Sequence, residues 1–331
     1  MRANRPVALP PESVGALLRR ASLPIGLGLL AGAGTAYGAF AYGPALFLLT
    51  PVVMGIGAAW IPRGPHPSPG SCISAAISTC LVVSLLFLLV GLEGALCLIM
   101  AMPLVATGAL VGGLIGGMVR RSWERPGTGA VLLLVAALPA ILAWDRPDVE
   151  AQPPSTVTTA VIVRAAPAQV WQQTVDFAPI TAPPTGLLRT GIAYPTHAVL
   201  RTEGSRRVRE CHFTTGVFVE PITTWDPPHH LAFDVADQPP SMQELSPWHI
   251  HPPHVDTLLR SQRGEFRITA LPDGTTRLEG TTWYTIGASP AWYWRLWSEP
   301  ILHAIHRRVL QSIAEHAERA GDRTVGATTG F

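Results

Sequence analysis

The pattern of hydrophobic and charged positions divides the chain in two near residue 146. Residues 21–62 contain no Asp, Glu, Lys or Arg, and comparable uncharged stretches follow up to Asp145. A charged side chain at the centre of a bilayer costs roughly 2.5 to 3.5 kcal/mol, so long uncharged apolar stretches indicate membrane-spanning helices. Beyond residue 146 the composition is that of a soluble domain. We therefore predict a multi-pass transmembrane domain over 1–150, a globular domain over 151–323 and a disordered tail over 324–331.

The membrane half is predicted to be an all-α bundle of about five helices. A hydrocarbon core about 30 Å thick is crossed by roughly 20 helical residues, so residues 21–62 are long enough for two spans with a break at Tyr42-Gly43-Pro44. Glu93 separates the third span from the fourth, either as a loop residue at the interface or as a buried relay. The small-residue spacing of Gly108, Gly112 and Gly116 predicts close helix packing. The expected spans lie near 23–41, 44–61, 72–91, 95–118 and 128–144.

The arginines predict the orientation of these spans. Alternate loops contain almost none, and the positive-inside rule places the arginine-rich ones in the cytoplasm. Five spans then put the globular domain outside the cytoplasm, on a multi-pass protein of the inner, or cytoplasmic, membrane. The arginines concerned precede the first span or follow the second and fourth: Arg2, Arg5, Arg19, Arg20, Arg63, Arg120, Arg121 and Arg125.

The second half has the pattern of strands and helices expected of an α+β domain. A strand is expected at 158–164, and Pro167 opens a helix. Pro272-Asp273-Gly274 predicts a hairpin turn, and Ser289-Pro290 starts a last helix that runs to about Ala320. Between the helix that Pro167 opens and the last helix lie six runs that are apolar or alternate with period 2, as is typical of strands: 193–202, 207–213, 216–225, 230–235, 264–271 and 277–286.

The order and spacing of three segments resemble the START-like, or SRPBCC, superfamily of polyketide cyclases and lipid-transfer proteins. The segments are 161–171 (VIVRAAPAQVW), 223–233 (TTWDPPHHLAF) and 271–278 (LPDGTTRL). The resemblance implies a helix-grip domain, in which an antiparallel sheet curves around a long C-terminal helix and encloses a hydrophobic cavity. It implies no particular reaction, because members range from carriers to enzymes. The sequence departs from the usual pattern in a Pro-rich insertion between Asp237 and Arg263, which we interpret as a lid over the cavity mouth.

Glu220 is the candidate catalytic residue. Apolar neighbours and Pro221 surround it in a strand, so it points either into the cavity, where burial would raise its pKa for proton transfer, or to solvent. We expect the ligand cavity or its lid to contain Glu220, Trp225, Trp248, His251, His254, Asp256, Trp283 and Trp297.

The histidines of the insertion have the residue types of a zinc site. His249, His251 and His254 stand close in sequence, with Glu244 and Asp256 nearby. Two prolines fix an extended backbone between the last two histidines, so the rings can point apart. We expect no metal and no other cofactor, with these three histidines as the alternative ligand set.

The preferred function is binding or transfer of a lipid or other apolar small molecule by a membrane-anchored protein. No nucleophile motif, phosphate loop or dinucleotide fingerprint occurs, and a net charge of +2 gives no sign of a nucleic-acid partner. The alternatives are a cyclase- or hydrolase-type enzyme that uses Glu220 or the histidines, and a non-catalytic sensing or interaction module.

Overall fold

The computed structural model describes residues 13–34, 42–43, 45–64, 66–122, 153–204 and 206–328. The chain forms two compact units. Unit 1 comprises Met1–Leu92 and Leu98–Arg146, and unit 2 comprises Glu93–Cys97 and Pro147–Phe331. By its contacts, the short segment Glu93–Cys97 therefore belongs to the second unit.

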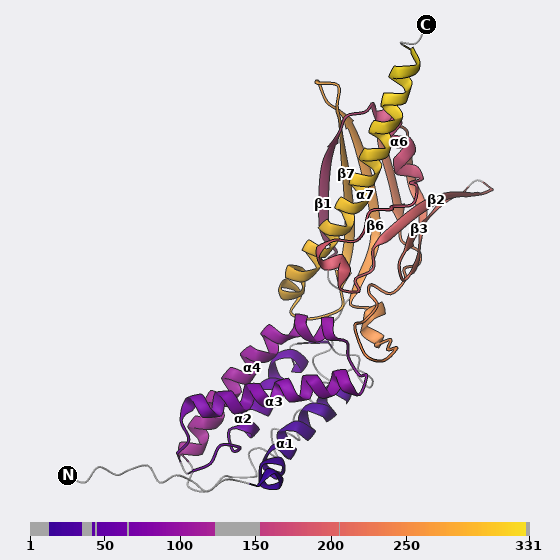
Figure 1. The fold of residues 1–331 in the computed structure, drawn as a ribbon. Helices are drawn as coiled ribbons and strands as arrows, with labels where there is room; N and C mark the ends of the chain where they lie inside the picture. Colours follow the sequence, from indigo (N-terminus) through magenta and orange to yellow (C-terminus); the bar gives the residue numbers. More distant parts are fainter. Residues whose placement is uncertain are drawn as a thin grey trace. The chain divides into compact units, whose positions relative to one another are not determined.

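The described part of unit 1 is helical (Figure 1). Three helices are long and apolar enough to cross a membrane, at Val14–Ala33, Pro69–Leu89 and Ala95–Arg121, and Ala45–Ala58 is a shorter apolar helix. These correspond to the predicted spans near 23–41, 72–91, 95–118 and 44–61, with the first displaced toward the N-terminus. The fifth predicted span, 128–144, lies outside the described residues. The elements are α1 (Val14–Ala33), η2 (Ala45–Leu49), α2 (Thr50–Ala58), α3 (Pro69–Leu89) and α4 (Ala95–Ser122).

Glycines bring the backbones of α4 and α2 into contact. A Cβ atom on Gly112 would lie 2.1 Å from the carbonyl oxygen of Val52, and one on Gly116 would lie 2.7 Å from that of Ile56. Any larger residue would force the two helices apart. The small-residue spacing in α4 thus has the packing role that the sequence predicted.

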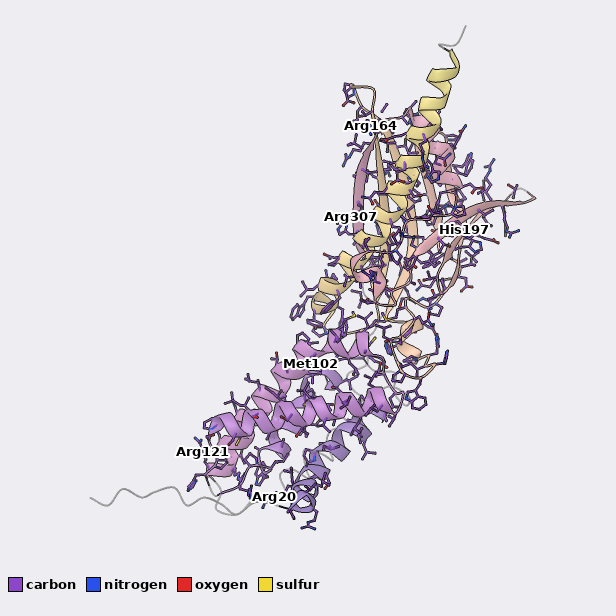
Figure 2. All side chains as sticks on the ribbon, in the orientation of Figure 1. Arg20, Met102, Arg121, Arg164, His197 and Arg307 are labelled. Carbon is purple, nitrogen blue, oxygen red and sulfur yellow. The ribbon has the colours of Figure 1, made fainter. Side chains whose placement is uncertain are left out.

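The described basic residues of unit 1 gather at one end. Arg120 donates hydrogen bonds of 2.7, 2.9 and 2.6 Å to the carbonyl oxygens of Ala59, Pro62 and Gly64, which follow α2. A Cβ on Gly57 would lie 3.5 Å from Pro24, and one on Gly28 would lie 2.6 Å from Met54, so α1 and α2 run antiparallel. Figure 2 shows Arg20 and Arg121 toward the same end of unit 1, with Met102 toward the other.

Unit 2 contains a seven-stranded antiparallel sheet in the order β1-β7-β6-β5-β4-β3-β2. All seven predicted strands and the two predicted helices are present. The long helix α7 lies along the sheet beside α6 (Figure 1). It is described as far as Thr328 and so enters the segment predicted to be a tail. The elements are β1 (Ser155–Val163), α6 (Pro167–Val175), η3 (Gly186–Arg189), β2 (Pro195–Glu203), β3 (Arg206–Phe213), β4 (Gly216–Asp226), β5 (His230–Asp234), η4 (Pro253–Asp256), β6 (Leu259–Ala270), β7 (Thr276–Ile286) and α7 (Ala291–Thr328).

The turn between β6 and β7 forms as its sequence predicts. The Asp273 carboxylate accepts hydrogen bonds of 3.0 Å from the Thr275 amide and 2.7 Å from its hydroxyl. Gly274 has a φ of +82°, which glycine adopts without steric cost. This turn sets the register in which Ala270 pairs with Thr276 and the rest of the hairpin follows.

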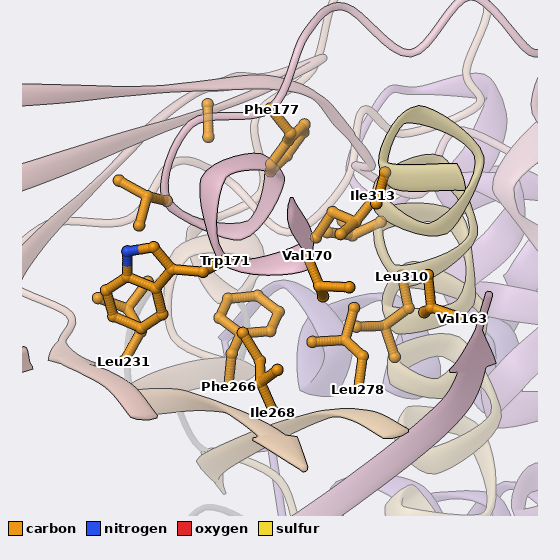
Figure 3. Close-up of a cluster of buried hydrophobic side chains, with 14 of the residues drawn as sticks. Val163, Val170, Trp171, Phe177, Leu231, Phe266, Ile268, Leu278, Leu310 and Ile313 are labelled. Carbon is orange, nitrogen blue, oxygen red and sulfur yellow. The ribbon is translucent and has the colours of Figure 1, made fainter. Parts of the chain in front are cut away.

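A hydrophobic core lies between the sheet and the two helices (Figure 3). Val163 and Leu278 come from the sheet, Val170 from α6, and Leu310 and Ile313 from α7, and none of the five is more than 1% exposed. Burial of such a side chain contributes roughly 1.5 to 3 kcal/mol, so this layer is the main attachment of α7 to the sheet. Alternation in β7 directs Leu278, Gly280, Thr282 and Tyr284 toward α7.

Candidate functional site

A buried ion pair lies inside the apolar layer of unit 2. Arg209 on β3 and Glu220 on β4 are cross-strand neighbours, and Arg209 Nη1 donates a hydrogen bond to Glu220 Oε2. Their side chains are only 2% and 7% exposed. Glu220 therefore points into the domain, as one of the two sequence interpretations held, and the solvent-facing interpretation is wrong. The inward direction follows from the pleat, because Cys211, two residues from Arg209, also lies in the core.

Three phenylalanine rings surround the Arg209 guanidinium. Its central carbon lies 5.4 Å from the Phe177 ring centre, 5.5 Å from that of Phe233 and 5.4 Å from that of Phe266. Such cation–π contacts contribute about 0.5 to 2 kcal/mol each. Within the described part of the chain, Arg209 Nε is buried and has no hydrogen-bond partner. One donor of the guanidinium thus remains directed into apolar surroundings.

The chemistry of this pair favours binding over proton transfer. Burial raises the pKa of the Glu220 carboxyl above its ordinary value, while the adjacent Arg209 guanidinium acts in the opposite direction. Arginine keeps its proton at any physiological pH, so the pair brings together one acid and one group that cannot act as a base. What the pair offers a ligand is the N–H donor at Arg209 Nε, on a guanidinium whose charge Glu220 balances.

A second polar group lies between α7 and the sheet. Thr159 Oγ1 lies 2.8 Å from His303 Nδ1 and 3.1 Å from His306 Nδ1, and Thr282 Oγ1 lies 2.8 Å from His306 Nε2. Burial, and secondarily the neighbouring His303, lowers the pKa of His306 to about 4. Neutral His306 therefore links α7 to β1 and β7. This group was not expected from the sequence, where its signal is the pair of histidines three residues apart on the last helix.

The insertion separates the residues predicted to form a lid. Trp248 is 58% exposed, and His251 forms an exposed pair with Asp256, with 2.9 Å between Nε2 and Oδ2. His254, in contrast, is only 3% exposed. Among the described residues, one group has the spacing of metal ligands, and it contains His254 without His249 or His251. The alternative ligand set of three histidines is therefore not assembled.

The predicted tryptophans occupy different places in unit 2. Trp225 packs against the core and meets Trp171 edge to face, with 5.2 Å between ring centres. Trp283 lies on the face of the sheet opposite α7, since its neighbours Thr282 and Tyr284 bond α7, and the Arg263 guanidinium lies 3.9 Å from its ring centre. Trp297 is half-buried near the start of α7. Of these three, Trp225 is the one that contacts the interior that also contains Glu220.

The group with metal-ligand spacing consists of Glu93, Cys97, Glu244 and His254, whose donor atoms all lie within 4.8 Å of one another. All four belong to unit 2. From the sequence, Glu244 was expected near the candidate zinc ligands, Glu93 at the interface or as a relay, and Cys97 fell within the span expected near 95–118. Only the fold brings these distant positions together.

The topology of unit 2 decides its fold. A strand, a helix, six further antiparallel strands and a long C-terminal helix packed on the sheet are the arrangement that the resemblance implied. The second unit therefore has a helix-grip fold. Its interior, where the resemblance implied a cavity, contains the aromatic and aliphatic core around Arg209.

Comparison with solved structures finds similarity to helix-grip proteins over about half of the chain. Zhui aromatase/cyclase from Streptomyces sp. R1128 is 16% identical, with 54% of this chain and 99% of that chain covered and a TM-score of 0.34. The di-domain aromatase/cyclase StfQ of the steffimycin biosynthetic pathway is 13% identical, with coverages of 60% and 63% and a TM-score of 0.36. The protein XoxI from Bacillus cereus is 16% identical, with coverages of 49% and 94% and a TM-score of 0.32. No family model and no curated protein matches the chain.

Proposed function

We propose that this protein is a membrane-anchored binding protein for a lipid or another apolar small molecule with an oxygen-bearing end. The observation that carries this proposal is the Arg209–Glu220 pair, which leaves one N–H donor of the guanidinium unused inside an otherwise apolar layer. Sites for small molecules are mostly apolar and contain a few polar groups that fix orientation. In this proposal Arg209 binds the polar end of the ligand. The apolar body of the ligand takes the place of the contacts that Phe177, Phe233 and Phe266 now make with the guanidinium.

The three long apolar helices support the anchoring part of the proposal. A ligand taken from or delivered to a bilayer would have a short path if its binding domain stays tethered to that bilayer. We also propose that the START-like domain lies outside the cytoplasm. The arginines at the start of α1, after α2 and at the end of α4 support a cytoplasmic location for that end of unit 1, and the apolar segment 128–144 is long enough to cross once more.

Analysis of what co-purifies with the full-length protein tests the ligand proposal. Protein purified in mild detergent is extracted with organic solvent, and the extract is compared by mass spectrometry between wild type and Arg209→Met/Glu220→Leu. We expect an amphiphile in the wild-type extract that falls at least tenfold in the double variant, because the variant loses the charge and keeps the apolar volume.

A matched control is available on the outer face of the same sheet. Exposed Arg201 on β2 and partly buried Glu210 on β3 form an ion pair, with 2.7 Å between Nε and Oε2. Arg201→Met/Glu210→Leu makes the same chemical change outside the core and should keep the ligand. Equal extracts from all three proteins, or no retained amphiphile after incubation with a broad lipid panel, would contradict the proposal.

A further inference from the structure

Four side chains from two distant parts of the sequence converge in unit 2. Cys97 Sγ lies 2.7 Å from Glu244 Oε1 and 3.2 Å from His254 Nε2. His254 Nε2 lies 3.9 Å from Glu244 Oε1, and His254 Nδ1 lies 3.7 Å from Glu93 Oε1. The side chains of His254, Glu244 and Glu93 are 3%, 1% and 12% exposed. A thiol, an imidazole and two carboxyl groups thus share one buried space.

The backbone around this cluster holds the donors in place. The amide of Ala95 donates a 2.8 Å hydrogen bond to the carbonyl oxygen of Leu245. A Cβ on Gly94 would lie 1.8 Å from Glu244 Oε2, so only glycine at this position lets the carboxylate approach. Ser241 bonds Val255 through both its amide, at 3.4 Å, and its hydroxyl, at 3.0 Å, which ties the two arms of the insertion together. The ligand atoms are therefore positioned by the fold before any ion binds.

The cluster also has an electrostatic need for a cation. Glu244 Oε2 is buried and has no hydrogen-bond partner within the described residues. A buried carboxylate oxygen without a partner is costly, and a bound cation would supply one.

The spacing and the donor types select the ion. Metal–donor distances of about 2.0 to 2.3 Å in tetrahedral geometry place neighbouring donors roughly 3.3 to 3.8 Å apart. The observed 3.2 and 3.9 Å separations around His254 Nε2 are close to this range, and the 2.7 Å contact of Cys97 with Glu244 needs a small expansion. Thiolate and imidazole donors favour zinc over magnesium or calcium, which prefer oxygen ligands.

We propose that Glu93, Cys97, Glu244 and His254 bind one zinc ion. Cys97 and Glu244 face His254 Nε2, whereas Glu93 Oε1 lies 3.7 Å from His254 Nδ1 and would have to turn toward the ion. With all four donors bound the tetrahedral shell is full, so the site is of the structural type and leaves no position for a substrate. Its role is to fix the insertion that follows β5 to the segment Glu93–Cys97. The proposal replaces the expectation of no metal, and it does not depend on the proposed ligand of Arg209.

Metal analysis of the full-length protein, purified in detergent without chelators, tests the site. We expect about one zinc ion per chain in the wild type and at least a tenfold lower content in Cys97→Ser and in His254→Gln. Two variants serve as matched controls: Cys211→Ser removes another buried thiol of unit 2, and His251→Gln removes the neighbouring exposed histidine. Both controls should keep the full zinc content.

Cobalt substitution keeps the test independent of how well the variants fold. After chelation, addition of cobalt to the wild type should give a thiolate-to-cobalt charge-transfer band, which Cys211→Ser retains. Glu244→Gln, which preserves the side-chain shape, should weaken cobalt binding 10- to 100-fold. A wild type with neither zinc nor the cobalt band would overturn the proposal, and so would zinc contents that Cys97→Ser leaves unchanged.

Discussion

The buried Arg209–Glu220 pair allows a stability prediction that is specific in sign and size. Glu220→Leu leaves the guanidinium buried among three phenyl rings without its counter-ion, and breaking a buried pair in this way costs about 3 to 5 kcal/mol. Arg209→Met leaves a carboxyl group that can take up a proton, so we expect a smaller loss of about 1 to 3 kcal/mol. Arg209→Met/Glu220→Leu removes both charges and should lie within about 2 kcal/mol of the wild type.

Urea unfolding of the full-length protein in mild detergent measures these changes. Tryptophan fluorescence is a suitable signal because Trp171 and Trp225 meet edge to face against the core. The double-mutant cycle should give a coupling energy of at least about 2 kcal/mol, whereas the same cycle on the Arg201–Glu210 pair should give about 1 kcal/mol or less. Additive single changes, or single changes that each cost less than about 1 kcal/mol, would refute the reasoning that an uncompensated buried charge dominates at this site.

Three further outcomes are expected. The free energy of unfolding should fall as the pH drops from about 6.5 toward 4, because burial lowers the pKa of His306 to about 4 and the unfolded state takes up the proton first. His306→Gln should reduce this loss by on the order of 3 kcal/mol. A pH profile of urea midpoints that is the same in wild type and variant would contradict this expectation. Gly112→Ala should lower the stability of unit 1 by about 1 to 3 kcal/mol in thermal melts, whereas Gly26→Ala, with nothing within 4 Å of its new Cβ, should not. Alkaline phosphatase fused after Phe331 should be active and green fluorescent protein at the same position should be dark; the reverse result would place the helix-grip domain in the cytoplasm.

The sequence by itself determined the elements of unit 2. Period-2 alternation, the Pro272–Gly274 turn and the Pro at the start of α6 are local signals, and all seven strands appear where these signals predicted them. The apolar positions Ile301, Val309 and Ile313 likewise marked the face of α7 that is buried. In unit 1 the absence of charge identified the three long apolar helices, because a single ionised side chain is costly in hydrocarbon.

Only the tertiary structure decided which polar residues meet. Alternation along β4 is equally compatible with Glu220 on either face, and the direction became clear only with Arg209 opposite it on β3. Trp283 likewise could have faced either side of the sheet. It lies on the outer face because its neighbours Thr282 and Tyr284 face α7.

The cluster around His254 shows most clearly that the sequence did not reveal which polar residues meet. Spacing within the insertion suggested His249 and His251 as its partners, but the extended backbone separates exposed His251 from buried His254. The actual neighbours, Glu93 and Cys97, lie some 150 positions earlier, with Cys97 Sγ to His254 Nε2 separated by 157 residues in sequence. Local patterns record which face of an element is buried, whereas contacts across such separations depend on how the elements pack, and that is decided by the sum of many weak interactions over the whole fold.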